Sequence, residues 1–174
     1  MPGVPVPGPV SVPADPPTRA RRRQALGLGL ACPPLAPGAD LGRDLVLATG
    51  PDGRRDLGVV DGLDNLVQGL QIALTTALGS DVFNTEFGFD GLRVLAEEAD
   101  PALARERVRI AVVRVLRQDA RVRGIADVRL VDARAGEPRP AAVESWRTAQ
   151  VRCVVETASS DPLTLTIDGV IPRG

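Results

Sequence analysis

The stretch that decides the fold lies near the end of the chain and reads VRCVVE over residues 151–156 and LTLTI over residues 163–167. Along both runs every second residue is apolar, which is the pattern of a β-strand with one buried face. The core-facing residues of this pattern are Val151, Cys153, Val155, Leu163, Leu165 and Ile167. Because residues 158–162 join the two runs, the sequence predicts a β-hairpin at this end of the chain.

A third strand is predicted just before this hairpin, over residues 125–131. It follows Gly124 and is rich in isoleucine, valine and leucine, residue types that suit a half-buried strand. The three runs together predict a small antiparallel sheet of about three strands that ends in the C-terminal hairpin.

A long helix is expected from Pro101 to about Gln118. Asp100 can cap it, and proline is favoured at the first helical position. The alternation over residues 107–110 would also suit a strand, but the helix-forming run 102–107 and the well-placed cap favour the helix.

An earlier helix is predicted to begin after an acidic cap, Asp61 or Asp64, and to end at Gly79. Its apolar residues fall three or four apart, at Leu66, Leu70, Leu74 and Ala77. Apolar runs around the turn at 51–53 predict a short extended pair, and residues 92–98 predict a short helix. The predicted fold class is therefore α+β, with two main helices and a short helix packed on the antiparallel sheet.

The N-terminal segment differs in composition from the rest. Ten of the 16 prolines lie within the first 37 residues. Each proline removes a backbone donor and fixes φ, so this segment is expected to form neither helix nor ladder. The sequence predicts an extended Pro-rich arm over residues 1–40 and one domain over residues 41–174. The arm is either a disordered tail or is held by a partner surface.

Composition excludes several classes of function. The chain has 174 residues, 21 basic and 22 acidic, which gives a net charge of -1 and a length that suits one domain. It contains no histidine, lysine or tyrosine. Histidine catalysis, histidine metal ligation and a lysine phosphate loop are thereby excluded. No enzyme activity, metal site or cofactor is expected.

The cysteines and apolar runs point to no redox, metal or membrane role. Cys32 and Cys153 form no CxxC motif, and a disulfide between them stays open at this point. No apolar run approaches the roughly 18 residues that span a bilayer. Residues 21–32 loosely imitate an export signal, but their apolar part is short. A cytoplasmic protein with no membrane partner is expected.

Charge is segregated along the chain. Residues 81–100 contain six acids and one arginine, whereas residues 105–129 contain eight arginines and three acids. Such a pattern indicates either a solvated face or a docking surface, since arginine binds carboxylate and phosphate alike. The acidic overall balance, with a pI near 5.5, argues against nucleic acid as the partner.

Residues 42–92 carry a resemblance to a known family. The matching residues are Gly42, Asp44 and Leu45, then Gly62, Asn65, Gln68 and Leu74, then Gly79, Phe83, Glu86, Phe87, Gly88 and Leu92. In this order they resemble the baseplate protein that initiates the sheath in contractile injection systems, a family that includes phage tail-baseplate wedge proteins and type VI secretion baseplate components. With the later helix and hairpin, the resemblance covers about 130 residues.

This resemblance implies a structural protein of a phage tail-like particle. Its C-terminal hairpin would accept sheath strands by β-augmentation. Its helices would dock to baseplate wedge proteins in a sixfold ring, next to inner tube or tube-initiator proteins. The implied contacts to wedge or neighbouring chains are Gln68, Asp119 and Arg121, and the implied loop anchors are Phe83, Phe87 and Gly88.

The sequence departs from the family at one motif. Where relatives usually carry Glu-Pro-Arg after the second helix, this chain has Asp119, Ala120 and Arg121. The literal Glu-Pro-Arg at 137–139 comes too late to match. Two interpretations stay open, in which Arg121 reaches a neighbouring chain's carboxylate or is an ordinary surface arginine beside a helix-end acid.

A hydrolase is the main alternative function, because some families of this kind bear a lysozyme label. Glycoside hydrolysis needs two carboxylates across a cleft. Asp81, Glu86 and Asp90 are candidates only through their proximity in the sequence. A polar loop with inward-packed phenylalanines explains them better, so no peptidoglycan hydrolysis is expected.

Overall fold

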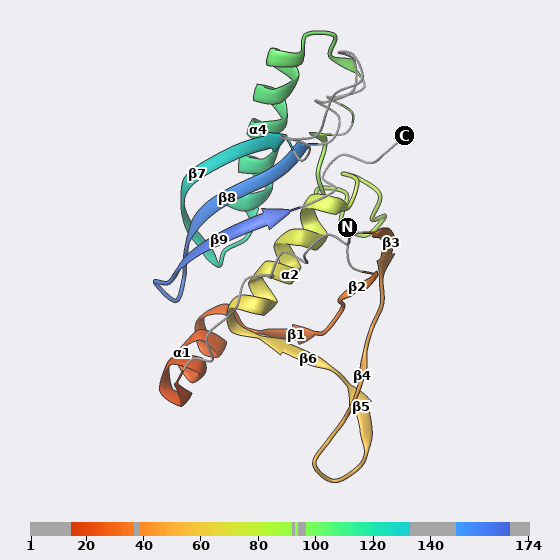
Figure 1. The fold of residues 1–174 in the computed structure, drawn as a ribbon, viewed down its shortest axis with the longest axis vertical. Helices are drawn as coiled ribbons and strands as arrows, with labels where there is room; N and C mark the ends of the chain where they lie inside the picture. Colours follow the sequence, from red (N-terminus) through yellow and green to blue (C-terminus); the bar gives the residue numbers. More distant parts are fainter. Residues whose placement is uncertain (1–14, 37–38, 92, 94–96, 133–148, 168–174) are drawn as a thin grey trace, which may run out of the picture.

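The computed structural model describes residues 15–36, 39–91, 93, 97–132 and 149–167 (Figure 1). Its elements are α1 (Pro16–Leu26), β1 (Leu28–Leu30), β2 (Pro34–Ala36), β3 (Ala39–Arg43), β4 (Leu47–Thr49), β5 (Arg55–Leu57), β6 (Val59–Asp61), α2 (Gly62–Thr75), α4 (Pro101–Gln118), β7 (Val122–Asp132), β8 (Ala149–Thr157) and β9 (Pro162–Ile167). The predicted α+β class is confirmed. The short helix expected over 92–98 lies largely outside the described residues, although Gly91, Arg93 and Glu97 are helical.

The C-terminal sheet has the strand order β7-β8-β9 and is antiparallel throughout. The predicted alternation is confirmed, since Val151, Cys153 and Val155 have no exposed surface while Arg152 and Glu156 between and beside them are exposed. One face of the sheet therefore lies on the core, and α4 packs along that face (Figure 1).

The segment 101–118 is a helix, as predicted, although part of it alternates as a strand would. The Asp100 carboxylate accepts hydrogen bonds from the backbone N–H groups of Ala102 and Leu103, at 2.8 and 3.4 Å. Ala104, Val108 and Val112 recur every four residues and are fully buried. The cap and the helical spacing of the buried stripe together decide the conformation.

The helix α2 carries the predicted apolar stripe, because Leu66, Leu70 and Leu74 are buried in the same core. The predicted carboxylate cap is wrong for Asp61, which stands at the N-cap without a capping bond and instead accepts from Arg19. The helix also ends at Thr75, before the Gly79 expected to close it.

The expected extended arm is wrong for residues 16–26, which form helix α1. Its two prolines occupy the first helical positions, where a missing N–H breaks no intrahelical bond and the fixed φ suits the helix. Leu26 at its end is fully buried in the core. The segment that follows pairs as β1 with β6 and as β2 with β3. Residues 1–14 and 37–38 of the expected arm lie outside the described residues.

The strands β4 and β5 form the predicted extended pair around the turn at 51–53. Figure 1 shows that this pair continues from β1 and β6 and extends away from the sheet and helices. No helix in the described part of the chain has the length and apolar character needed to cross a membrane.

Candidate functional site

The outer edge of β9 is the feature of the fold that is open to a further strand. In the described part of the chain, β9 pairs with β8 and with no other strand. The backbone N–H of Thr157 donates to the carbonyl of Asp161, which makes these two residues a hydrogen-bonded pair of the antiparallel ladder. Since bonded and non-bonded pairs alternate, the backbone groups of Thr164 and Thr166 point away from β8.

The same alternation places Pro162 at the first free-edge position. Pro162 pairs with Glu156, between two hydrogen-bonded pairs, so its nitrogen faces the open edge. A proline there removes no ladder bond and adds no outward donor. The edge therefore offers backbone donors at Thr164 and Thr166.

The six predicted hairpin residues serve mainly to hold this edge in place. Val151, Cys153, Val155 and Leu165 are buried and Leu163 is half-buried, while Ile167 lies in β9 with its side chain outside the described set. Burial also raises the pKa of the Cys153 thiol to about 11, and both cysteines are free thiols. A partner strand would thus meet the backbone of β9 rather than these side chains.

The turn between β8 and β9 is fastened to α1. Arg22 of α1 donates two hydrogen bonds to Asp161, from Nε to Oδ2 at 2.9 Å and from Nη2 to Oδ1 at 3.1 Å. Asp161 also accepts from the Ser159 hydroxyl. The hydrogen bond from Arg22 holds the pKa of Asp161 below its usual range. The contact orients the tip of the hairpin against the helix.

Asp119 and Arg121 form a clamp inside the chain. Arg121 donates to Asp119 through Nε at 2.9 Å and Nη2 at 2.6 Å, and through Nη1 to the backbone carbonyl of Leu26 at 3.4 Å. Burial acts to raise the pKa of Asp119, but the hydrogen bonds from Arg121 outweigh it and the pKa is lowered. A Cβ at Gly69 would lie 2.8 Å from Nη2 of Arg121, so α2 has a glycine where the guanidinium passes.

This clamp explains what the Asp119-Ala120-Arg121 motif does within the chain. It joins the end of α4 to the end of α1, across 95 residues of sequence. The proline expected from the family is not needed for this geometry, because Asp119 itself accepts the backbone N–H of Arg121 at 2.9 Å. The predicted contact of these residues with a neighbouring chain stays a prediction.

Gln68 is also engaged within the chain. Its Oε1 accepts from the backbone N–H of Cys32 at 2.7 Å, and its Nε2 donates to the carbonyl of Leu30 at 2.8 Å. The side-chain amide therefore completes backbone hydrogen bonds at the end of β1. Its contacts fix the strand on α2, and the predicted wedge contact is not needed to explain the residue.

The loop after α2 corrects one predicted anchor. Phe83 is 97% exposed, because a turn in which Asp81 accepts its backbone N–H lifts it away from the core. Phe87 is half-buried, and the actual anchor is Phe89, which is 2% exposed. In the fold the Phe89 ring lies against Gly91, where any Cβ would collide with it.

Gly88 keeps its predicted structural role. It has φ of 113°, and a Cβ there would lie 2.8 Å from the backbone carbonyl oxygen of Thr76. The neighbouring Phe89 donates its backbone N–H to the same carbonyl at 2.8 Å. Only glycine allows the loop to approach the end of α2 this closely.

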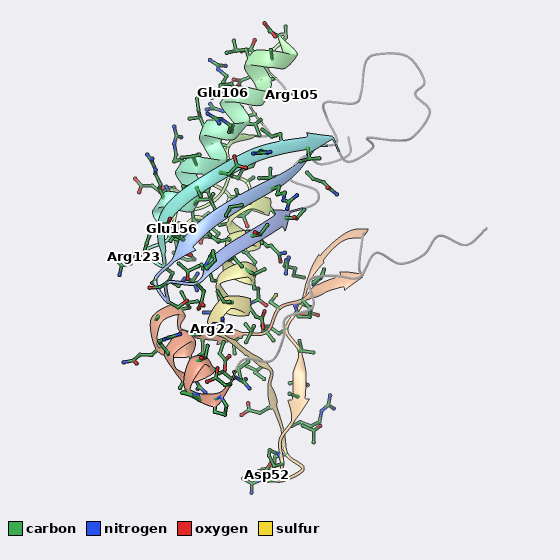
Figure 2. All side chains as sticks on the ribbon, turned by 60° about the vertical axis from the view of Figure 1, so that its left-hand side comes forward. Arg22, Asp52, Arg105, Glu106, Arg123 and Glu156 are labelled. Atoms are coloured by element: carbon green, nitrogen blue, oxygen red, sulfur yellow. The ribbon has the colours of Figure 1, made fainter. Side chains whose placement is uncertain are left out.

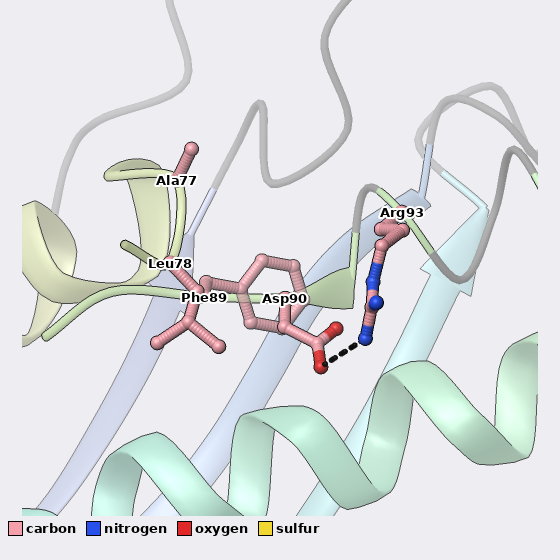
Figure 3. A pocket seen from close by; sticks show the side chains of 5 residues that line it. All are labelled: Ala77, Leu78, Phe89, Asp90 and Arg93. Carbon is pink, nitrogen blue, oxygen red and sulfur yellow. Dashed lines mark hydrogen bonds and ion pairs between the residues drawn. The ribbon is translucent and has the colours of Figure 1, made fainter. Parts of the chain in front are cut away.

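A shallow pocket beside this loop bears on the hydrolase alternative. It is lined by Ala77, Leu78, Phe89, Asp90 and Arg93 (Figure 3). Asp90 is its one carboxylate and lies 3.4 Å from the Arg93 guanidinium. The other two candidate acids are not among its lining residues. A single carboxylate beside an arginine is not the acid pair that glycoside hydrolysis requires.

Some of the segregated charges meet in space. Glu98 pairs with Arg107 at 3.2 Å, and Asp90 lies 4.0 Å from Arg114, so acids of the loop region face arginines of α4. Figure 2 shows Arg105 and Glu106 toward the outer end of the same helix. The pattern along the sequence is thus partly neutralised in the fold.

Comparisons of the chain with protein-family models, with curated proteins and with solved structures found no match.

Proposed function

We propose that this chain is a structural, non-enzymatic baseplate component of a contractile injection particle, and that it starts the sheath by accepting a strand of a sheath subunit at the free edge of β9. The observation that carries the proposal is the pair of outward-facing backbone positions, Thr164 and Thr166, on a strand that no described segment covers. Edges of this kind bind extended segments through main-chain hydrogen bonds.

Rigidity of the edge supports the same proposal. Leu165 anchors β9 in the core, and the bonds between Arg22 and Asp161 hold the start of the strand. A preorganised edge loses less conformational freedom on binding than a loose one does. The strand is therefore suited to act as a template for the first sheath subunits.

In the same proposal, the helices contact wedge subunits in a sixfold ring around the inner tube. Leu103 and Ile110 of α4 support such a contact. They lie seven residues apart, hence on one side of the helix, and are about half exposed. Burial of both side chains in a neighbouring subunit would be favourable.

Single substitutions at the edge test the proposal. Deleting the whole hairpin would also remove the buried strand β8, so Thr166→Pro is the sharper change. It removes one outward N–H and no bond of the existing ladder. Purified sheath and wedge subunits from the same genome are mixed with the chain, and sheath assembly is followed by pelleting and electron microscopy. We expect Thr166→Pro to lower assembly at least tenfold.

Thr166→Val is the matched control, because it keeps the N–H and removes the hydroxyl. We expect it to assemble sheath as the parent chain does. Circular dichroism and thermal unfolding of both variants check that each is folded. Normal sheath assembly by a folded Thr166→Pro variant would overturn the role of the β9 edge.

A further inference from the structure

Two β-pairs of the N-terminal half form one continuous two-stranded ribbon. Gly58 donates its backbone N–H to the carbonyl of Val46 at 2.7 Å, and its own carbonyl accepts from the N–H of Ala31 at 2.8 Å. Residues 55–61 are therefore one strand that pairs first with β4 and then with β1 along the same edge. Figure 2 shows Asp52 at the far tip of this ribbon.

Five large aliphatic side chains lie on one face of the ribbon, here called the ribbon face: Leu28, Leu30, Leu47, Leu57 and Val59. Leu47 pairs with Leu57 and Leu30 pairs with Val59, and residues paired across strands share a face. Leu57 and Val59 are two residues apart on one strand, as Leu28 and Leu30 are on another, and side chains two apart point to the same face. All five are between 41% and 65% exposed.

The opposite face of the ribbon is the one that packs against the rest of the domain, at α2. A Cβ at Gly29 would lie 2.6 Å from Oδ1 of Asn65 on α2, and Val60, its partner in β6, is half-buried. A Cβ at Gly58 would likewise meet the side chains of Ala31 and Val46, which shows that these point to the opposite side from Leu30 and Leu57. The ribbon face is consequently the outward one.

The exposed apolar side chains of the ribbon face are typical of an interaction surface. Contiguous exposed apolar patches mark interaction sites, whereas single exposed aliphatic residues do not. An isolated two-stranded ribbon is also only marginally stable in water. Every residue of β4 and β5 is exposed, so this part of the ribbon gains no burial from the described domain.

The charges near the two ends of the ribbon face indicate which charge a partner should carry. Arg55 continues the face beyond Leu57, and no ion pair of Arg55 occurs within the described ranges. At the other end Asp61 is already bound by Arg19 at 3.2 Å. Arg23, one helical turn beyond Arg19, is exposed. The apolar strip therefore has at one end an arginine, Arg55, that forms no ion pair within the described ranges, and at the other end an ion pair with the exposed Arg23 one helical turn from it.

A second copy of the chain is a poor occupant. Two ribbon faces stacked in either direction would bring arginines of one copy against arginines of the other. An occupant with negative charge fits better.

We propose that the ribbon face docks one amphipathic α-helix of a partner protein, apolar along its centre and carrying carboxylates near both ends. Seven strand residues span about 23 Å, which matches a helix of roughly 15 residues. Two strands with their side chains are about as wide as one helix. This surface lies apart from the β9 edge, so the inference does not depend on the proposed sheath contact.

Two synthetic helical peptides test the proposal. Both carry leucines every three or four residues over 18 positions, and they differ only in having glutamates or lysines at the two ends. Binding to the full chain is measured by fluorescence anisotropy. We expect the glutamate peptide to bind at least tenfold more tightly than the lysine peptide. Equal affinity, or no binding of either peptide, would overturn the proposal.

Variants locate the binding to the ribbon face. The double change Leu47→Ser and Leu57→Ser should weaken binding of the glutamate peptide at least tenfold. Ala48→Ser is the matched control, because Ala48 pairs with Asp56 on the opposite face of the same hairpin, and it should leave binding unchanged. Equal binding by both variants would contradict the proposal. Self-association would also contradict the proposal. It would appear in ultracentrifugation as a concentration-dependent dimer that binds neither peptide and that the leucine variant does not form.

Discussion

The C-terminal sheet has one buried face and one open edge. The ribbon instead has an exposed face, and along β4 and β5 both of its faces are exposed. Val151 and Val155 of the sheet have no exposed surface, but Leu47 and Leu57 of the ribbon are about half exposed. The sheet can therefore be extended in its own plane by backbone hydrogen bonds. The ribbon also has an exposed apolar face, which the side chains of a partner could cover. One short chain thus has two kinds of unfinished β-structure, which suit two different partners.

The largest expected difference between these regions is in what an aliphatic side chain contributes to stability. Leu165→Ala in β9 should lower the free energy of unfolding by about 2–5 kcal/mol, because it leaves a cavity in the core. Leu57→Ala in β5 should change it by less than about 0.5 kcal/mol. Urea unfolding followed by circular dichroism measures both. Similar losses in the two variants would mean that the ribbon face is covered within the chain.

The next effect concerns the clamp behind the sheet. Asp119→Ala removes the acceptor of three hydrogen bonds from Arg121 and leaves a half-buried guanidinium without its carboxylate. We expect a loss of about 2 kcal/mol. Asp56→Ala is the counterpart in the ribbon, where the carboxylate is exposed and accepts from its neighbour Leu57, and it should be close to neutral. An equally small loss for Asp119→Ala would show that the clamp is dispensable.

The smallest effect is a dependence on pH at the hairpin tip. Because Arg22 lowers the pKa of Asp161 in the folded chain, this contact stabilises the fold above the ordinary carboxyl pKa and loses its effect as pH falls through the lowered value. Asp161→Asn should therefore cost about 1 kcal/mol at pH 7, and the difference from the parent chain should shrink below about pH 4.

Asp52→Asn is the control for the hairpin tip. Its exposed pair with Arg54, at 3.8 Å on the ribbon turn, should contribute little at either pH. Thermal unfolding at pH 7 and pH 3 measures all three chains. A loss for Asp161→Asn that is the same at both values would exclude the charge of Asp161 as its cause.

The sequence predicts the fold correctly where the local hydrophobic pattern coincides with the surface that is buried. Alternation in β8 and β9 and the cap at Asp100 predicted the sheet and α4, because each pattern coincides with the surface that the core covers. Helix α1 does not follow from the proline-rich composition, because Pro16 and Pro17 occupy its first positions, where proline removes no intrahelical bond. Phe83 was misjudged because a turn, and not its hydrophobicity, decides where it lies.

The two candidate surfaces differ in how far sequence could reveal them. The open edge follows from the hairpin itself. The ribbon face depends on the register that pairs Leu47 with Leu57 and Leu30 with Val59, and on the bonds at Gly58 that join the two pairs. Leu30 and Val59 are 29 positions apart in the sequence, and no local pattern encodes their pairing.

The proline that opens β9 has a consequence for alignment. A chain that pairs with this edge finds no donor beside Pro162 and meets the first one at Thr164, so registers that place an acceptor beside Pro162 are disfavoured. A slip by a single residue would turn every side chain of the added strand to the wrong side. In the proposed function, one imino acid would thereby limit the registers available to the first added strand.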